Sequence, residues 1–220
     1  MEVINLGAQD TIINRYMAQL RDTDYQRNRT LFRQNITRIA HAMAYEISRS
    51  LQYAQQSVRT PLGEATVRLP QDRIVIGTVL RAGLAFHQGF LDVFDGADSA
   101  FVAAYRKEGS KDDLQIHLEY MAAPPLDNST FLLVDPMLAT GGSLELAYKA
   151  FLGGGLPRKL HICTVIASEE GIERLRHAFP SDEVTLWTAA IDAELNEQAY
   201  IVPGLGDAGD LCFGPKLPST

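Results

Sequence analysis

The chain has 220 residues, 46% of them hydrophobic and 21% charged, which suits one globular domain with a buried core and excludes a disordered chain. Its formal charge of -7 argues against nucleic acid as a partner, although a few arginines and backbone amides can still bind a small anion. The two cysteines form no metal-ligand pair or disulfide framework, and no stretch has the length of a membrane span or the pattern of a secretory signal. We therefore expect a soluble, cytoplasmic protein.

Residues 1–72 are predicted to form a helical N-terminal extension. From residue 11 to residue 53 the apolar residues recur at helical spacing, and the clearest series is Ile36, Ile39, Ala40, Met43 and Ile47. Residues 28–30 interrupt this run, and Thr30 is a candidate N-cap for the second helix. We expect the extension to cover one side of a sheet or to contact another subunit.

Residues 73–190 are expected to form the core of the domain, because short β-rich runs alternate there with segments of helical periodicity. The predicted strands are 74–80, 100–105, 131–134, 160–167 and 184–188, and the predicted helices are 84–93, 142–152 and 170–178. This alternation indicates an α/β fold with a mainly parallel sheet and helices on both faces. Ligands bind such sheets beyond the carboxyl ends of the strands.

One interval breaks the alternation. Residues 105–113 are charged and contain a glycine, and residues 114–120 then alternate strictly between apolar and polar. This pattern predicts a hairpin arm with a mobile tip. The arm is either an ordinary solvated loop or a lid over a reactive site.

Residues 131–143 have the composition of a phosphate site. A predicted buried strand ends in Asp135, and small residues from Ala139 to Ser143 then open a helix. Backbone amides of such a loop, the positive end of the helix, and the hydroxyls of Thr140 and Ser143 can bind a phosphate. The carboxylate just before the loop is well placed to accept hydrogen bonds from sugar hydroxyls. On composition alone, however, many glycine-rich turns merely begin a helix.

The run Asp135-Pro136-Met137-Leu138-Ala139-Thr140-Gly141-Gly142-Ser143 resembles the signature that binds phosphoribosyl pyrophosphate (PRPP) in type I phosphoribosyltransferases. Most of that superfamily has two adjacent acids, whereas uracil phosphoribosyltransferases have Asp-Pro. Leu80-Arg81-Ala82-Gly83-Leu84 looks like the pyrophosphate loop, Tyr105-Arg106 like the second arginine site, and residues 200–210 like the uracil-binding loop. The resemblance therefore implies a type I phosphoribosyltransferase fold in a single domain, residues 1–220, with residues 191–220 as the hood.

For activity, the resemblance implies the transfer of the phosphoribosyl group of PRPP to N1 of uracil, giving UMP and pyrophosphate. No general base is assigned, and Mg²⁺ is expected mainly on PRPP and water, close to Asp207. The expected PRPP-binding residues are Arg81, Arg106, Asp135, Pro136, Met137, Leu138, Ala139, Thr140, Gly141, Gly142, Ser143 and Asp207. The expected uracil-binding residues are Ile201, Gly206, Asp207 and Ala208.

The resemblance also implies a non-proline cis peptide in the turn at residues 80–82, a homodimer or higher homo-oligomer, and GTP as a candidate effector. Four places depart from the family pattern. Ser168-Glu169 replaces Ala-Pro, Leu211 replaces arginine, Pro215 replaces threonine, and the arm tip at residues 107–109 is unusual.

Three other functions stay open. A phosphoribosyltransferase for purines or orotate would need a different hood. An RNA-binding regulator of pyrimidine genes should have a basic face, against which the acidic net charge counts. A nucleotide-binding scaffold without chemistry would be expected to have lost Arg81, Asp135 or Asp207.

Overall fold

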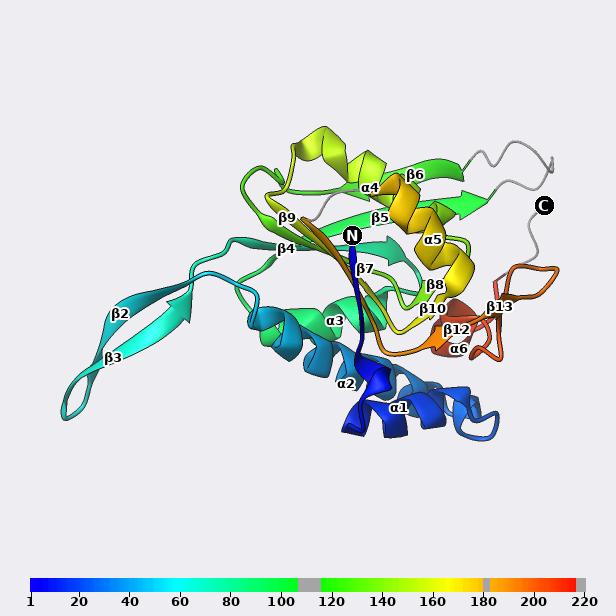
Figure 1. Cartoon of the computed structure of the whole chain (residues 1–220), viewed down its shortest axis with the longest axis horizontal. Coiled ribbons are helices and arrows are strands. Elements are labelled where there is room, and N and C mark those ends of the chain that lie inside the picture. The colour runs from blue at the N-terminus through cyan, green and yellow to red at the C-terminus, as the bar shows by residue number, and fades with distance from the viewer. Residues whose placement is uncertain (107–115, 180–182, 217–220) are drawn as a thin grey trace.

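The computed structural model describes residues 1–106, 116–179 and 183–216, and in this part of the chain the central feature is a seven-stranded sheet (Figure 1). Neighbouring strands are parallel except for the last pair, β5 and β6, which is antiparallel. In spatial order the strands are β1 (Glu2–Asn5), β11 (Val184–Thr188), β9 (Lys159–Thr164), β7 (Thr130–Val134), β4 (Ile74–Leu80), β5 (Asp98–Arg106) and β6 (Ile116–Ala122). The predicted mainly parallel sheet is confirmed.

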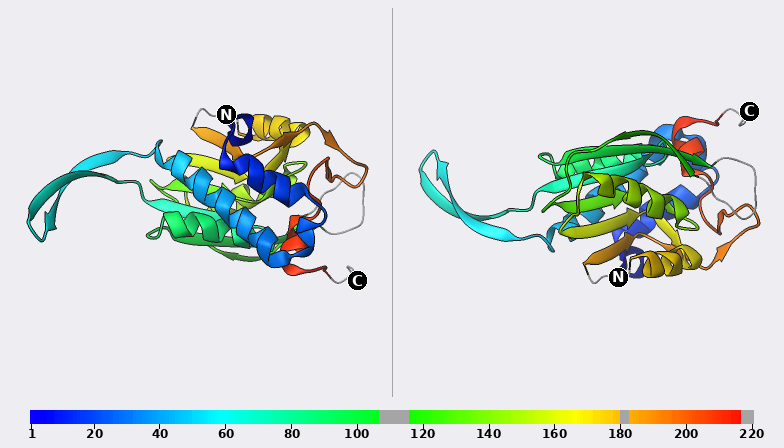
Figure 2. Two further views of the ribbon diagram at one scale, coloured as in Figure 1. Left: turned by 90° about the horizontal axis from the view of Figure 1, so that it is seen from below. Right: turned by 90° about the horizontal axis from the view of Figure 1, so that it is seen from above.

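Helices cover both faces of this sheet, as predicted (Figures 1 and 2). On one face lie α1 (Ile12–Arg21), α2 (Arg29–Ser48) and α3 (Leu84–Val93), and on the other lie α4 (Gly142–Phe151) and α5 (Glu169–Ala178). All five residues of β7 are buried. Leu132 and Val134 join the hydrophobic cluster of α1, α2 and α3, whereas Phe131 and Leu133 join the cluster of α4 and α5. This two-sided burial explains why the strand is continuously apolar.

The remaining elements are short. They are the 3-10 helices η1 (Leu6–Ala8), η2 (Tyr25–Arg27) and η3 (Leu152–Gly154), the strands β8 (Met137–Leu138), β10 (Ile166–Ser168), β12 (Ile191–Asp192), β13 (Glu194–Leu195) and β14 (Ile201–Val202), and the helix α6 (Ala208–Phe213). Strands β12, β10 and β8 form a small parallel sheet, so the run predicted as one strand over 160–167 is divided between two sheets. Figure 1 shows β8, β10, β12, β13 and α6 gathered at one end of the molecule.

The N-terminal extension is not wholly helical, and that prediction is corrected. Glu2–Asn5 is a strand of the central sheet, and Tyr53–Thr60 (β2) pairs with Gly63–Pro70 (β3) in a long hairpin that projects from the body (Figure 1). The hairpin was missed because it packs neither face on a core and so lacks the alternation of a half-buried strand. The four-residue β1 is too short for any periodicity to show.

The N-cap of α2 is also corrected. Asn28, not Thr30, caps the helix, because the Asn28 side chain accepts hydrogen bonds from the amides of Thr30 and Leu31 at 3.1 Å each. Asparagine precedes threonine in N-cap preference, so the sequence already favoured it.

The predicted hairpin arm has β5 and β6 as its two strands. Its tip, residues 107–115, lies outside the described residues, so mobility and closure of the tip stay predictions. None of the helices in the described ranges is long and apolar enough to cross a membrane.

Candidate functional site

The strand order of the central sheet reverses between β4 and β7. The chain runs from β4 through α3 to β5 on one side, and from β7 through α4 to β9 on the other. At such a reversal the connecting segments diverge, and a crevice opens beyond the carboxyl ends of the two strands. Arg81 directly follows β4 and Asp135 directly follows β7. The fold therefore brings these two predicted site residues to one crevice, although 54 positions separate them (135 − 81).

The predicted phosphate loop, residues 139–143, leads into the first turn of α4. The N-cap residue Gly141 has a φ of +79°, a left-handed conformation that favours glycine, and no side chain caps the helix. The first amides of a helix have no intrahelical acceptor and carry its partial positive charge. Thr140 and Ser143 are half-buried beside them. This arrangement suits an anion, as the sequence predicts.

Residues 136–138 connect Asp135 to this loop. Pro136 and Leu138 are buried, whereas Met137 is only half-buried. Strand β8 pairs with β10 in register, Met137 with Ile166 and Leu138 with Ala167. The small parallel sheet thus holds the segment that leads into the loop.

Asp135 is 9% exposed, and its Oδ1 accepts a hydrogen bond from the Met137 amide at 3.2 Å. Burial is the main cause that raises the pKa of this carboxyl to about 7; the Met137 hydrogen bond opposes the shift, and the negative charge of Asp207 adds to it. Asp207 belongs to the predicted hood, whose Ala208 amide contacts Met137, two residues after Asp135. A buried carboxylate with one backbone donor has acceptor capacity left for further hydroxyl groups.

Arg81 lies in a turn whose Leu80–Arg81 peptide is cis, as the resemblance implies. Its Nη2 donates to Oδ1 of Asp210 at 2.9 Å, and both side chains are 38% exposed. A Cβ added to Gly209 would lie 3.7 Å from that of Ala82, so α6 packs directly on the turn. Asp210 thus pairs with the predicted pyrophosphate ligand.

Within the predicted hood, the uracil-binding loop, residues 200–210, runs from β14 into α6. Val202–Pro203 is cis, and Gly204 and Gly206 have φ values of +60° and +89°. Asp207 caps α6 by accepting from the Asp210 amide at 2.9 Å. The Ala208 amide donates to Met137 Sδ at 3.4 Å, which joins the hood to the strand before the phosphate loop.

Sequence reasoning missed the residues that hold this hood. The Arg21 guanidinium binds both carboxylate oxygens of Asp192 at 2.7 Å and the carbonyl of Gly204 at 2.9 Å. Asp192 also accepts from the Gly204 amide at 2.8 Å, and Gln26 donates to the Leu205 carbonyl at 2.8 Å. The Arg21 hydrogen bond holds the pKa of Asp192 below its usual range. No local sequence signal marks this anchor, because its partners are up to 183 positions apart.

Arg106 ends β5. That strand is parallel to β4, so its carboxyl end lies at the same edge of the sheet as the crevice. Its contact with pyrophosphate stays a prediction.

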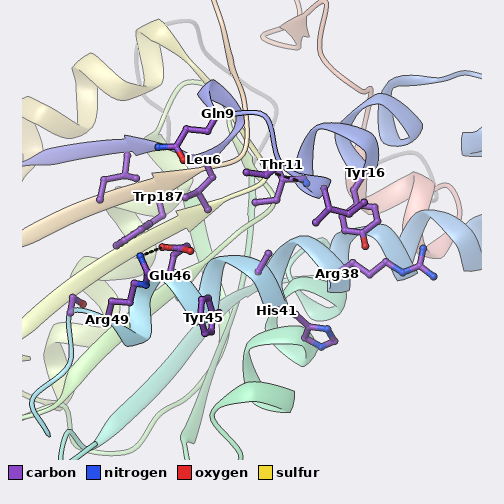
Figure 3. Close-up of a pocket in the computed structure, with 15 residues that line it drawn as sticks. Leu6, Gln9, Thr11, Tyr16, Arg38, His41, Tyr45, Glu46, Arg49 and Trp187 are labelled. Carbon is purple, nitrogen blue, oxygen red and sulfur yellow. Dashed lines mark hydrogen bonds and ion pairs between the residues drawn. The ribbon is translucent and has the colours of Figure 1, made fainter.

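A cavity of about 860 Å³ lies away from this crevice, between β1, α1 and α2 (Figure 3). Tyr16, Arg38, Tyr45 and Trp187 are among the residues that line it. None of the predicted site residues lines it.

His161 lies in strand β9. It is fully buried and accepts at Nδ1 from Trp187 Nε1 at 3.0 Å. Burial lowers its pKa to about 4, so it is neutral near pH 7. In the described part of the chain, no group of three or more histidine, cysteine or acidic side chains could hold a metal ion.

The sheet has a small-residue loop after one strand, an arginine turn after the neighbouring strand, and a C-terminal segment that packs on both. This is the architecture of a phosphoribosyltransferase. A family model described as uracil phosphoribosyltransferase matches residues 8–215. The chain belongs to that family.

Individual relatives support the same family assignment. A uracil phosphoribosyltransferase of Porphyromonas gingivalis is 50% identical over 217 residues, which cover 99% of this chain and all of the relative. Among solved structures, the AQ2163 protein of Aquifex aeolicus is 30% identical with a TM-score of 0.85, covering 96% of this chain and 98% of that protein. A hypoxanthine phosphoribosyltransferase of Staphylococcus aureus shares the fold at 10% identity, with a TM-score of 0.50 over 79% of this chain and 85% of its own.

Proposed function

We propose that this protein is a uracil phosphoribosyltransferase, a pentosyltransferase that joins N1 of uracil to the ribose carbon of PRPP and releases pyrophosphate. The observation that supports the proposal is the reversal of strand order between β4 and β7, where a small-residue loop at a helix start follows one strand and an arginine turn follows the other. PRPP has two phosphorylated ends on either side of its reacting carbon, so its binding site needs two anion sites, one on each side of a sugar site.

The roles follow from the chemistry of each group. The amides and hydroxyls of residues 139–143 bind the 5-phosphate, and Asp135 accepts from the ribose hydroxyls. Arg81 and Arg106 bind pyrophosphate, because a guanidinium pairs with phosphate oxygens in a bidentate manner. Since Arg81 pairs with Asp210, pyrophosphate would compete with that carboxylate for the guanidinium.

Displacement of pyrophosphate passes through a state with positive charge on the ribose ring. The chain contributes by holding both ends of PRPP, by aligning the base nitrogen with the reacting carbon, and by placing carboxylates near the developing charge. Asp135 and Asp207 are the carboxylates to which we assign this role. As the bond between N1 and the ribose carbon forms, the bond to pyrophosphate breaks and the N1 proton leaves to water or to the released pyrophosphate, and no general base is assigned in the protein.

We propose that Mg²⁺ binds with PRPP. The donor set fits a hard cation, because the crevice offers carboxylate oxygens and Mg²⁺ on a diphosphate usually keeps several waters. Asp207 is the residue that would hold it, directly or through water. The ion would neutralise charge on the diphosphate leaving group.

The hood supplies the base site. Uracil has an acceptor–donor–acceptor edge, and main-chain groups of Ile201, Gly206 and Ala208 can match it. The amide of Ala208 has only a thioether sulfur as acceptor, a weak partner that a uracil oxygen could replace. The positive φ of Gly206 is a conformation that few other residues adopt, so the main chain there is free of side-chain bulk.

We further propose that the protein is a homo-oligomer. The β2–β3 hairpin projects from the body (Figure 2), and Leu62 at its tip is fully exposed. A two-stranded hairpin is marginally stable alone, so contact with a second copy would stabilise it.

A cytoplasmic location fits the two cysteines, Cys163 and Cys212, which are buried and unpaired. GTP stays a candidate effector, to be tested by its effect on the rate.

The test of activity is UMP formation from uracil, PRPP and Mg²⁺ by the purified protein. Arg81→Ala should raise KM for PRPP at least tenfold and leave KM for uracil within about threefold. Absence of UMP with the unmodified protein, together with UMP formation by a known relative under the same conditions, would refute the proposal.

A further inference from the structure

Helix α5 presents one face to the phosphate loop. Ser168, Gly171 and Arg174 follow one another at intervals of three residues, which places them on the same side of the helix. A Cβ on Gly171 would collide with the Ala139 carbonyl oxygen, and one on Gly142 would lie 3.5 Å from the Arg174 guanidinium. The helix is therefore packed against the loop backbone itself.

Ser168 makes the polar contact of this face. Its Oγ accepts from the Gly171 amide at 2.9 Å, which caps α5, and donates to the Ala139 carbonyl at 2.6 Å. The side chain is fully buried, so water cannot easily replace either partner. One hydroxyl thus fixes both the start of α5 and the direction of one carbonyl in the loop.

The direction of that carbonyl determines the direction of an amide. Ala139 C=O and Thr140 N–H belong to one planar peptide group, which is trans, so they point in opposite directions. Because Ser168 holds the carbonyl toward α5, the Thr140 amide points away from α5. We propose that Ser168 is a positioning residue that aims the Thr140 amide at the 5-phosphate of the substrate.

This inference rests on the proposed function, because it takes residues 139–143 as the 5-phosphate loop. Ser168→Ala would leave the buried Ala139 carbonyl and the Gly171 amide without this hydroxyl as a partner.

The experiment is calorimetric titration of the full-length protein with ribose 5-phosphate and, separately, with Mg²⁺ and pyrophosphate. Ser168→Ala should weaken ribose 5-phosphate binding about fivefold and leave pyrophosphate binding unchanged within about twofold. Ser168→Thr, which keeps the hydroxyl, should restore binding. Ser168→Gly, which costs little as an N-cap, should repeat the loss if the alanine variant is unstable.

The matched control is Thr11→Ala. Thr11 also caps a helix by its hydroxyl, accepting from the Ile13 amide at 3.3 Å, but α1 is remote in sequence from the loop. This variant should bind both ligands normally. Equal ribose 5-phosphate affinity in Ser168→Ala and the unmodified protein, or an equal loss for both ligands, would overturn the positioning role. Failure of the unmodified protein to bind ribose 5-phosphate would instead overturn the loop assignment itself.

Discussion

Asp135 is subject to two opposing effects. The fold buries it beside Asp207 and raises its pKa to about 7, which favours the neutral carboxylic acid. Ribose hydroxyls donate hydrogen bonds to it in the proposed complex, which favours the carboxylate. Binding of PRPP should therefore cause Asp135 to release a proton near neutral pH. The reason is that the ribose hydroxyls supply hydrogen-bond donors that the protein alone does not supply.

The raised pKa gives a prediction for stability. An unfolded aspartate titrates near 4, so the fold holds the proton of Asp135 more tightly than the unfolded chain does. Its contribution to stability is complete below pH ~4 and is lost as the pH rises through about 7. Relative to Asp135→Asn, the free energy of unfolding of the unmodified protein should fall by up to about 4 kcal/mol across this range.

Urea unfolding of both proteins between pH 4 and 8, without substrates, measures this difference. Curves that stay parallel over the whole range would show that the Asp135 pKa is not raised. Adding PRPP should reduce the pH dependence, because ribose hydroxyls stabilise the ionised form.

At the scale of elements, side-chain hydrogen bonds hold the hood in place, and its main-chain groups are the ones that we propose contact the base. Arg21 and Asp192 hold Gly204 from both sides, and Gln26 holds Leu205. A loop held this way can discriminate bases through backbone groups, which no side-chain substitution removes.

The hood should therefore reject cytosine strongly. Cytosine replaces the O4 acceptor of uracil by an amino donor and the N3 donor by an acceptor, so two buried contacts would be mismatched. Each mismatch costs about 1–3 kcal/mol, which together imply a loss of about three orders of magnitude in kcat/KM. Rates with uracil, 5-fluorouracil, thymine and cytosine at saturating PRPP measure this, with 5-fluorouracil as the accepted control. Similar kcat/KM values for cytosine and uracil would contradict the role of the hood.

The β2–β3 hairpin gives the second prediction at this scale. Replacement of residues 54–69 by a short turn should leave the core folded, because the hairpin projects from it, but should lower the oligomeric state. Sedimentation velocity measures the change, and circular dichroism checks the fold. Leu62→Ser, which alters only the exposed tip, is a milder variant that should weaken association without removing the hairpin. A deletion variant with the same number of subunits as the unmodified protein would exclude the hairpin as the contact.

For the molecule as a whole, an element or contact could be predicted where neighbouring residues in the sequence carry its pattern. Strand β4 and helix α3 were predicted with their observed bounds, because apolar residues mark them in the sequence itself. The crevice was predictable from the residues directly after β4 and β7. The β2–β3 hairpin was not, because it buries no face within the chain. The contacts of Arg21 with Asp192 and of Ser168 with Ala139 could not be predicted from the sequence, since tertiary structure alone brings these residues together.

The most direct test of the proposed site is a crystal structure of the protein with UMP and pyrophosphate. The phosphate of UMP should lie on the amides of residues 139–143, the ribose hydroxyls on Asp135, and the uracil ring against residues 201–208. Pyrophosphate should lie beside Arg81, with its guanidinium released from Asp210. A nucleotide bound with its phosphate away from residues 139–143, or in the cavity between α1 and α2, would contradict the account.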